Sequence, residues 1–301
     1  MRNVGEGRAG AGRGGTLYVV PTPIGNHGDI TVRAIEVLRQ AGIVASEDTR
    51  HARTLLRHLD IEARLVSYHE HNEDSRSQEL LAVLEEGTDV ALISDAGTPL
   101  VNDPGYRIVT AAIAGGIRVC PLPGTSAVLT ALVGSGLPVH RFHYVGFLPR
   151  RQAARKEALA ALAALTGAVV CFEAPHRLTA TLADMQEVLG DRRASLGRNL
   201  TKADERFIRG TLSELIAELG TDDAVRGEYT VVVEGAADGP ADADQELGGR
   251  LADALVRRGA DPRLTRDVVR EVTGLPRNWV YERVRVAEEN HGRDRLAATR
   301  G

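Results

Sequence analysis

Short apolar runs alternate with helical patterns through most of this chain, and this alternation constrains the fold more than any other feature of the sequence. In the first half we expect strands at 17–20, 43–46, 64–67, 90–94 and 117–120, and helices at 31–40, 50–58, 75–86, 106–114 and 126–133. Strands that alternate with helices of this length are typical of βαβ units. The sequence therefore predicts an α/β fold with a largely parallel sheet.

The same alternation continues in a second half. Helices are expected at 153–165, 175–189 and 212–219, and strands at 168–173, 195–200, 207–209 and 229–234. A length of 301 residues suits about two such domains. We predict α/β domains at 16–148 and 149–235, a Gly- and Arg-rich disordered tail at 1–15, a linker at 236–246, a helical module at 247–290 and a tail at 291–301.

The C-terminal region is predicted to be purely helical. Helices at 251–258, 262–273 and 277–288 are separated by short Gly-containing turns, a spacing typical of a helix-turn-helix-like unit. From Gln245 onward there are twelve arginines against nine acidic residues, whereas the whole chain has a net charge of −4. This local excess favours a polyanion as partner, although a three-helix cap that only packs on the body is the alternative.

Three loops that follow expected strands carry turn-forming residues. The run 90–93 leads into Ser94-Asp95-Ala96-Gly97-Thr98-Pro99, the run 17–20 leads into Pro21-Thr22-Pro23-Ile24-Gly25-Asn26, and the run 117–120 leads into Pro121-Leu122-Pro123-Gly124-Thr125-Ser126-Ala127. In an open α/β sheet such loops meet at the carboxyl edge and build ligand sites there. No GxxxxGK[ST] and no GxGxxG follows a strand, so nucleoside triphosphate and ordinary dinucleotide sites lose support. After the first of these loops, Asp103 is the expected N-cap of the next helix and Pro104 its first residue.

Seven segments together make the chain resemble a known family. They are LYVVPTPIGNHGDI (17–30), ASEDTRH (45–51), SDAGTPLVNDPGY (94–106), PLPGTSA (121–127), YVGFLP (144–149), EAPHRL (173–178) and LTK (200–202). In this order they resemble the bacterial ribosomal RNA small-subunit methyltransferase I family, a branch of the tetrapyrrole methylase superfamily. The resemblance covers roughly residues 16–290.

The resemblance implies methyl transfer from S-adenosylmethionine to the ribose 2′-hydroxyl of a cytidine in the decoding region of small-subunit (16S) ribosomal RNA. It also implies a two-domain fold with the cofactor in the cleft between the domains. We expect no metal, because His69 and His71 have no third ligand at metal spacing. The expected cofactor-binding residues are Pro21, Pro23, Gly25, Asp95, Ala96, Gly97, Thr98, Pro99, Ser126, Ala127 and Glu173.

Catalysis of this transfer needs a base, or a cation that stabilises the developing alkoxide. Lys202 is one of only two lysines in the chain, whereas the other basic residues are arginine, which suggests that a lysine is required there. Glu47, Asp48 and Arg50 follow an expected strand and so lie at the same sheet edge. We predict Lys202 as catalytic, assisted by Glu47 or Asp48 and by Arg50; capping of the next helix is the alternative role for Asp48.

The predicted partner is the small ribosomal subunit. Phosphate contacts are expected from Arg177, Arg257, Arg258, Arg263, Arg266, Arg270 and Arg277. The superfamily implies a homodimer, and composition favours a cytoplasmic protein with no membrane span and no disulfide between Cys120 and Cys171. A tetrapyrrole methylase and a non-catalytic helix-turn-helix module are the alternative functions.

Two positions depart from the family pattern. The usual Arg-Glu-Leu-Thr-Lys is Arg198-Asn199-Leu200-Thr201-Lys202 here, which argues against a catalytic base at position 199. The Pro-Gly-Pro that is common in the third loop is Pro123-Gly124-Thr125, a change that leaves Ser126 and Ala127 in place.

Overall fold

The computed structural model describes residues 14–220, 225–236 and 242–298. The chain divides into two compact units, Met1–Ala236 and Ala237–Gly301. Most of the predicted N-terminal tail, residues 237–241 of the predicted linker and residues 299–301 lie outside the described residues.

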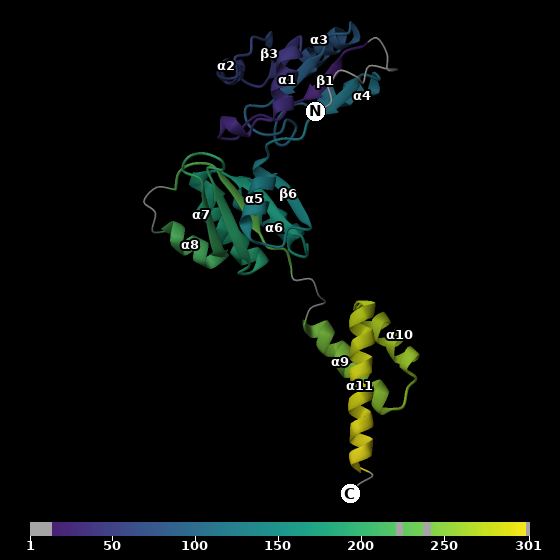
Figure 1. Cartoon of the computed structure of the whole chain (residues 1–301). Helices are drawn as coiled ribbons and strands as arrows, with labels where there is room; N and C mark the ends of the chain where they lie inside the picture. Colours follow the sequence, from purple (N-terminus) through teal and green to yellow (C-terminus); the bar gives the residue numbers. More distant parts are fainter. Residues whose placement is uncertain (1–13, 221–224, 237–241, 299–301) are drawn as a thin grey trace. The chain divides into compact units, whose positions relative to one another are not determined.

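A five-stranded parallel sheet forms the first half of the larger unit (Figure 1). Its strands are β1 (Thr16–Val19), β2 (Ile43–Ser46), β3 (Leu65–Ser67), β4 (Val90–Ile93) and β5 (Arg118–Pro121), in the order β3-β2-β4-β1-β5. The helices between them are the short 3₁₀ helix η1 (His27–Asp29), α1 (Val32–Gln40), α2 (Thr49–His58), α3 (Glu73–Glu85) and α4 (Tyr106–Ala114). The predicted α/β alternation is confirmed, with strand bounds within about one residue.

Helices cover both faces of this sheet. On one face, Leu38 of α1 and Leu56 of α2 pack against the strands, and on the other face Leu84 of α3 and Ile108 of α4 do so. β2 and β4 are buried along their whole length. Burial on both faces explains why these strands are continuous apolar runs rather than alternating ones.

The strand order determines where a site can form. β4 lies between β1 and β2, although β1 and β2 are consecutive in the chain. The connections therefore leave the β1–β4 boundary in opposite directions. The crevice at such a boundary, outside the carboxyl ends of the strands, is the usual ligand site in open α/β sheets.

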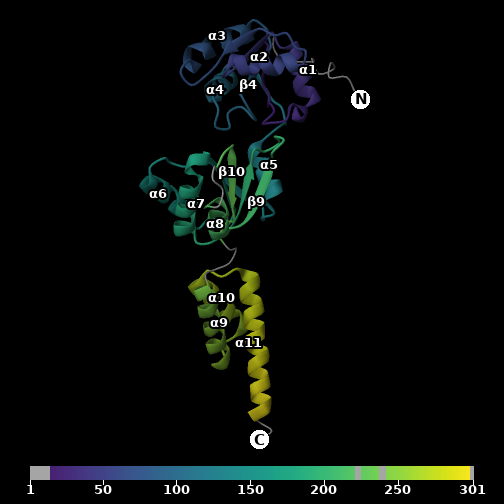
Figure 2. The same cartoon turned by 90° about the vertical axis from the view of Figure 1, so that its left-hand side faces the viewer.

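A second, mixed sheet follows in the order β6-β7-β10-β8-β9. Only β6 and β7 pair in parallel; β10 runs antiparallel to both β7 and β8, and β8 runs antiparallel to β9. Its strands are β6 (Phe142–Phe147), β7 (Ala168–Glu173), β8 (Arg193–Arg198), β9 (Arg206–Thr211) and β10 (Tyr229–Val233). Its helices are α5 (Ala127–Ser135), α6 (Gln152–Leu162), α7 (Pro175–Leu189) and α8 (Leu212–Gly220), with α5 on one face and the other three on the opposite face (Figure 2).

The second sheet begins earlier in the chain than the predicted boundary after residue 148. β6 was not expected as a strand, yet it pairs with β7. Val128 and Leu132 of α5 are buried against Val170 and Val232 of the second sheet. The boundary between the two halves therefore precedes α5, because the apolar face of α5 packs on the second sheet.

The start of α4 also differs from the expectation. Gly105, with φ of 138°, is the N-cap, and the helix begins at Tyr106. Asp103 and Pro104 precede the helix instead of capping it. A Cβ at Gly105 would lie 2.8 Å from the side chains of Leu92 and Leu100, so close packing requires glycine here.

The smaller unit consists of α9 (Asp242–Arg257), α10 (Pro262–Thr273) and α11 (Arg277–Ala298). Asp261 caps α10 by accepting from Arg263 N at 2.8 Å, and Gly274 ends it with φ of 66°. The bounds of α10 match the prediction. α9 begins within the predicted linker, and α11 extends ten residues beyond its predicted end at residue 288.

The core of this unit is small and apolar. Ala252, Val269, Leu275, Val280 and Val284 are buried together. Among the described helices, none is long and apolar enough to cross a membrane.

Candidate functional site

The loops after β1 and β4 are hydrogen-bonded to each other through their backbones. Thr22 N donates to Gly97 O and Gly97 N donates to Thr22 O, both at 2.9 Å. Gly97 has φ of 84°, a conformation that favours glycine, and an added Cβ would lie 3.3 Å from Ile24. Adjacency of β1 and β4 brings these two loops together, as the sequence predicted.

The loop after β5 is fastened to the same two loops. Thr98 Oγ1 donates to Thr125 O at 2.8 Å, and the hydroxyl of Thr125 donates to Thr22 O. Ser126 caps α5 by accepting from Leu129 N. The third loop therefore supports the first two.

The loop after β2 joins them at the other side of β4. Asp48 N donates to Asp95 Oδ1 at 3.1 Å. Asp48 is the N-cap of α2, and its carboxylate also pairs with the Arg50 guanidinium at 2.7 Å. This pairing with Arg50 holds the pKa of Asp48 well below its usual range.

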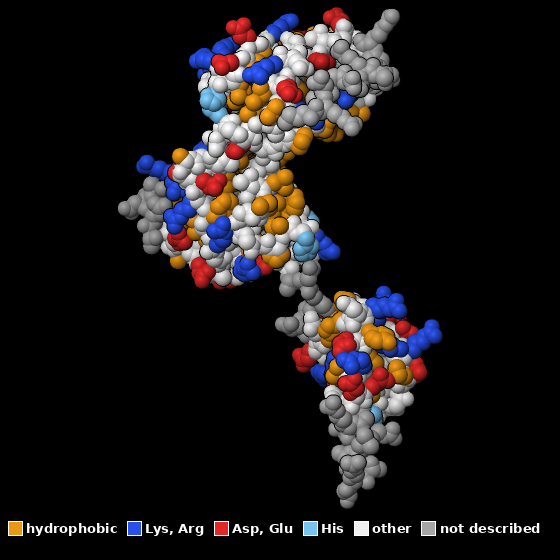
Figure 3. Space-filling view, in the orientation of Figure 1, with side chains coloured by type: hydrophobic (Ala, Val, Ile, Leu, Met, Phe, Trp, Pro, Cys, Tyr) orange, Lys and Arg blue, Asp and Glu red, His pale blue; other side chains and the backbone are white. Residues whose placement is uncertain are grey.

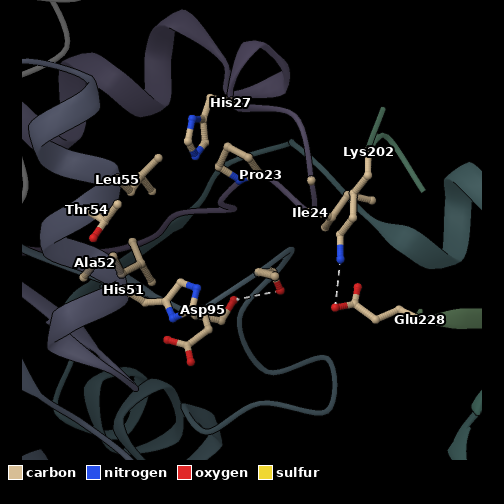
Figure 4. Close-up of a pocket in the computed structure, with 14 residues that line it drawn as sticks. Pro23, Ile24, His27, His51, Ala52, Thr54, Leu55, Asp95, Lys202 and Glu228 are labelled. Atoms are coloured by element: carbon tan, nitrogen blue, oxygen red, sulfur yellow. Dashed lines mark hydrogen bonds and ion pairs between the residues drawn. The ribbon is translucent and has the colours of Figure 1, made fainter. Parts of the chain in front are cut away.

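A cavity of about 280 Å³ opens at this edge (Figure 4). Its walls come from the β1 and β4 loops, from η1 and α2, and from two residues that border the second sheet. The lining residues are Pro23, Ile24, Gly25, His27, His51, Ala52, Thr54, Leu55, Ile93, Ser94, Asp95, Ala96, Lys202 and Glu228.

Lys202 and Glu228 form an ion pair in the cavity wall. Lys202 Nζ lies 3.0 Å from Glu228 Oε1, and their side chains are 36% and 75% exposed. Lys202 lies in the β8–β9 loop, and Glu228 directly precedes β10. The antiparallel pairing of β8 with β10 brings the two together, since Arg198 at the end of β8 faces Tyr229 at the start of β10. Figure 4 shows the pair on the side of the cavity away from α2.

Asn199 fixes the geometry of this loop. It is buried, its Nδ2 donates to Asp204 at 2.7 Å, and its Oδ1 accepts from Glu228 N at 2.9 Å. Its φ of 49° lies in the left-handed region, which asparagine tolerates better than glutamate. The departure from the family pattern at position 199 therefore has a structural explanation, in which Asn199 holds the backbone of Glu228.

The loop also contacts the β1 loop directly. Asn26 N donates to Thr201 Oγ1 at 3.1 Å, and a Cβ at Gly25 would lie only 2.6 Å from Lys202 Cγ. Thr201 has φ of 62°, which is strained for a β-branched residue. Gly25 is thus required where the two loops meet, in addition to lining the cavity.

The four predicted catalytic residues are not all brought together. Lys202 lines the cavity, whereas Glu47, Asp48 and Arg50 do not. The Arg50 side chain is 86% exposed and pairs with Asp48, so its charge is directed to the helix cap rather than to the cavity. The capping role that the sequence left open for Asp48 is the one that the structure contains.

Of the predicted cofactor residues, too, only some line the cavity. Pro23, Gly25, Asp95 and Ala96 line the cavity. The others predicted in the three loops do not line it; they are Pro21, Gly97, Thr98, Pro99, Ser126 and Ala127. Of these, Gly97 and Thr98 hydrogen-bond to the neighbouring loops, and Ser126 caps α5. Gly97 offers no free backbone N–H to a ligand, because its N–H and C=O are both hydrogen-bonded to Thr22.

Glu173 and Arg177 form an internal pair instead of a ligand site. The Glu173 carboxylate is fully buried, accepts from Ala174 N at 2.8 Å and from Thr181 Oγ1 at 2.6 Å, and lies 3.2 Å from Arg177 Nε. Arg177 also donates to Leu148 O at 2.8 Å, and its side chain is only 16% exposed. The predicted phosphate contact of Arg177 does not fit this geometry, because its guanidinium is engaged inside the fold.

Three carboxyl groups gather beside the cavity. Burial raises the pKa of Asp103 to about 6, with Glu47 and Asp95 adding to the rise and a hydrogen bond with Ser94 opposing it. Burial also raises the pKa of Glu47, and the charge of Asp95 adds to that effect. No group of three or more metal-binding side chains suited to a metal ion occurs among the residues that the structure describes.

Sequence reasoning missed several lining residues. His51, Thr54 and Leu55 line the cavity from one side of α2, and His51 belongs to the ASEDTRH segment, so a helical projection could have found them. Glu228 carries no local signal, because only the pairing of β8 with β10 brings it to Lys202.

Comparisons with known proteins agree with this architecture. The tetrapyrrole (corrin/porphyrin) methylase family matches residues 16–216. The ribosomal RNA small subunit methyltransferase I of Micromonospora olivasterospora is 64% identical over 278 residues, which cover 92% of this chain and 89% of the relative. The protein of the same name from Escherichia coli O157:H7 is 44% identical over 274 residues, covering 89% and 94%.

Among solved structures, uroporphyrin-III C-methyl transferase from Thermus thermophilus complexed with S-adenyl homocysteine has the same fold. It matches with a TM-score of 0.52 at 20% identity, covering 72% of this chain and 97% of that one. The chain therefore belongs to the tetrapyrrole (corrin/porphyrin) methylases, in the branch of the ribosomal RNA small subunit methyltransferases I.

Proposed function

We propose that this protein transfers a methyl group from S-adenosylmethionine to the ribose 2′-hydroxyl of a cytidine in the decoding region of small-subunit ribosomal RNA. The names of its relatives support methylation of this RNA. The single observation that carries the proposal is the position of Lys202, the lysine of the LTK segment, in the wall of a cavity built by the PTPIGN and SDAGTP loops.

The cavity fits the cofactor chemically. Pro23, Ile24 and Leu55 offer apolar surface for a ring system, and Asp95 offers an exposed carboxylate for hydroxyl or ammonium groups. Its volume is close to the lower end for small-molecule sites. S-adenosylmethionine supplies an electrophilic methyl group when bound.

Lys202 is the residue for which we propose a direct catalytic role. Its ammonium places positive charge beside the cavity, where it would stabilise negative charge that develops on an acceptor oxygen. Glu228 holds this ammonium at 3.0 Å and so orients it. An exposed ion pair of this kind contributes little to stability, about 0–1 kcal/mol, so its presence is explained better by positioning than by folding.

Binding of RNA is proposed to involve the smaller unit. Arg257, Arg258, Arg263, Arg270 and Arg277 are all exposed, and none of them forms an ion pair among the described residues. The guanidinium of Arg266 lies 4.7 Å from the centre of the Tyr281 ring. Replacing Arg270 and Arg277 by Gln should lower the slope of log affinity against log salt by about two if both contact phosphates. An unchanged slope, measured on small-subunit particles, would favour a structural cap.

We further propose that the protein acts in the cytoplasm as a homodimer. The exposed apolar side chains of Leu129 and Val133 on α5 suit burial against a second copy. Sedimentation analysis of the full chain would give its mass in solution.

A direct test uses small subunits from a strain that lacks this protein. The purified full chain and S-adenosylmethionine should add one methyl group, which mass spectrometry of nuclease and nucleoside digests would locate on a cytidine ribose. Methylation of a uroporphyrin-type tetrapyrrole, with no methyl group added to ribosomal RNA, would instead establish the alternative function.

A further inference from the structure

The exposed surface of α2 carries two neighbouring rows of side chains. Because residues three and four apart share a helix face, Arg50, Arg53 and Arg57 form one row, here called the arginine stripe. His51, Thr54 and Leu55 form the adjoining row and line the cavity. The arginine stripe therefore borders the cavity wall directly.

The positive charge of the stripe is largely unneutralised. Arg53 and Arg57 are exposed, and neither forms an ion pair among the described residues. Arg50 is paired with Asp48 but stays 86% exposed. The helix itself contains no acidic residue. Asp60 and Glu62, which follow its C-terminal end, are exposed and form no ion pair with the stripe in the described structure.

Folding alone does not account for this composition. α2 packs through Ala52 and Leu56, and any polar residue would satisfy the opposite face. Arg57 lies in the last turn, where a cation interacts favourably with the helix dipole. That reason does not apply to Arg53 in the middle of the helix, where acidic residues would serve equally well.

The wall beside the stripe is held in place by aromatic contact. The rings of His27 in η1 and His58 in α2 lie 4.3 Å apart, and His27 lines the cavity. Figure 3 shows basic and histidine side chains at the edge of the molecule where Figure 1 places α2. A ligand that spans the cavity mouth and the stripe would thus contact this wall first and then the exposed arginine side chains.

We infer that the arginine stripe binds the phosphate backbone of the RNA strand whose ribose is methylated at the mouth of the cavity. Guanidinium groups match phosphate geometry in a bidentate manner, and their spacing along one helix face suits successive phosphates of a strand. The inference rests on the proposed function and adds a docking surface in the larger unit. In this proposal α2 positions the RNA strand that carries the methyl-accepting ribose, and the arginines of the smaller unit make additional phosphate contacts elsewhere on the RNA.

The test compares two double variants of the full chain. Arg53→Gln/Arg57→Gln removes two charges from the stripe, and Arg64→Gln/Arg118→Gln is the matched control. Arg64 directly precedes β3 and Arg118 begins β5, so both lie at the amino edge of the sheet; both are exposed and form no ion pair among the described residues. Affinity for small-subunit particles is measured across a salt series, together with methylation kinetics and cofactor affinity by calorimetry.

The stripe variant should bind particles roughly 10- to 100-fold more weakly at low salt, with a salt slope lower by about two. Its KM for particles should rise, while kcat at saturation and cofactor affinity stay near those of the wild type. The control should behave like the wild type in every measurement. Unchanged particle affinity and salt slope in the stripe variant would overturn the inference, as would equal losses in the control. If the wild type itself does not methylate small-subunit RNA, the proposed function fails, and that result is separate from any effect of the stripe.

Discussion

The two sides of the cavity are built differently. On the first-sheet side, Thr22 is hydrogen-bonded to the backbone of Gly97 and accepts from the hydroxyl of Thr125, so these polar groups are satisfied within the protein. On the second-sheet side, the charged side chains of Lys202 and Glu228 stay accessible and are 36% and 75% exposed. Thr201, which precedes Lys202 in the β8–β9 loop, has a strained backbone conformation. Thr22, Gly97 and Thr125 of the most recognisable motifs thus form a scaffold, and the accessible charges beside the cavity are Asp95 on the first-sheet side and the pair of Lys202 and Glu228 on the other.

Substitutions on the two sides should therefore have different effects on stability, cofactor affinity and turnover. Mutations on the first-sheet side should act through the shape of the loops and change stability and cofactor affinity together. Mutations of Lys202 should change turnover and leave the fold intact, because an exposed pair contributes little to stability.

The largest effect is expected for Lys202→Ala. Loss of one preorganised electrostatic partner typically costs on the order of 10²–10³ in rate. Lys156→Ala is the matched control, since it removes the only other lysine, which also forms a surface ion pair, at 2.6 Å from Glu187. Turnover on small-subunit particles and the thermal midpoint should be measured for both variants.

Lys202→Ala should lose turnover without a matching loss of stability, whereas Lys156→Ala should keep both. Wild-type turnover in Lys202→Ala would remove the catalytic proposal. Lys202→Arg sharpens the test, because it keeps the charge but changes its reach beside Gly25.

A smaller effect is expected for Gly97→Val. Valine at φ of 84° is strained by about 1–3 kcal/mol, and its Cβ presses on Ile24 beside the cavity. Cofactor affinity, measured by calorimetry, and stability should therefore both fall. The control is Gly116→Val, which has a φ of 69° and no atom within 4 Å of an added Cβ.

The control should lose stability without losing cofactor affinity. Equal affinity in Gly97→Val and the wild type would contradict a cofactor site at the β1 and β4 loops.

The smallest effect is a pH dependence at Asp103. Its pKa is raised from 3.8 to about 6 in the fold, mainly by burial, so the neutral form is favoured. The stability from this group is fully present below about pH 4 and is lost as pH rises through 6. Asp103→Asn should therefore raise the free energy of unfolding at pH 8, and with it the thermal midpoint, by on the order of 1 kcal/mol after allowance for solvent screening, and the gain should vanish near pH 4.

The opposite sign is expected for Asp191, whose pKa is lowered by hydrogen bonds from Ser213. Asp191→Asn should lose stability at neutral pH relative to the wild type. A gain in Asp103→Asn that does not depend on pH would mean that packing, and not ionisation, is responsible.

The elements with strong local patterns were predictable from sequence. β2 and β7, and the helices α7 and α10, have the predicted bounds, because apolar periodicity, Pro at the first turn and Gly at the end are local signals. β6 was missed because it is an edge strand with a bulge, and Gly146 in it has φ of 64°. Its sequence shows no alternation that would distinguish it from a connection.

The features of the site likewise fall into those that local sequence patterns predict and those that tertiary contacts decide. The sequence by itself determined the α/β alternation and the loops at strand ends, and it singled out Lys202 as a candidate, since strand period, turn residues and amino-acid usage are properties of short segments. Tertiary structure alone decided that Gly97 is bonded to Thr22, that Arg177 pairs inside the fold with Glu173, and that Glu228 meets Lys202. Those contacts join segments far apart in the chain, and strand order and pairing set their partners, which no local pattern encodes.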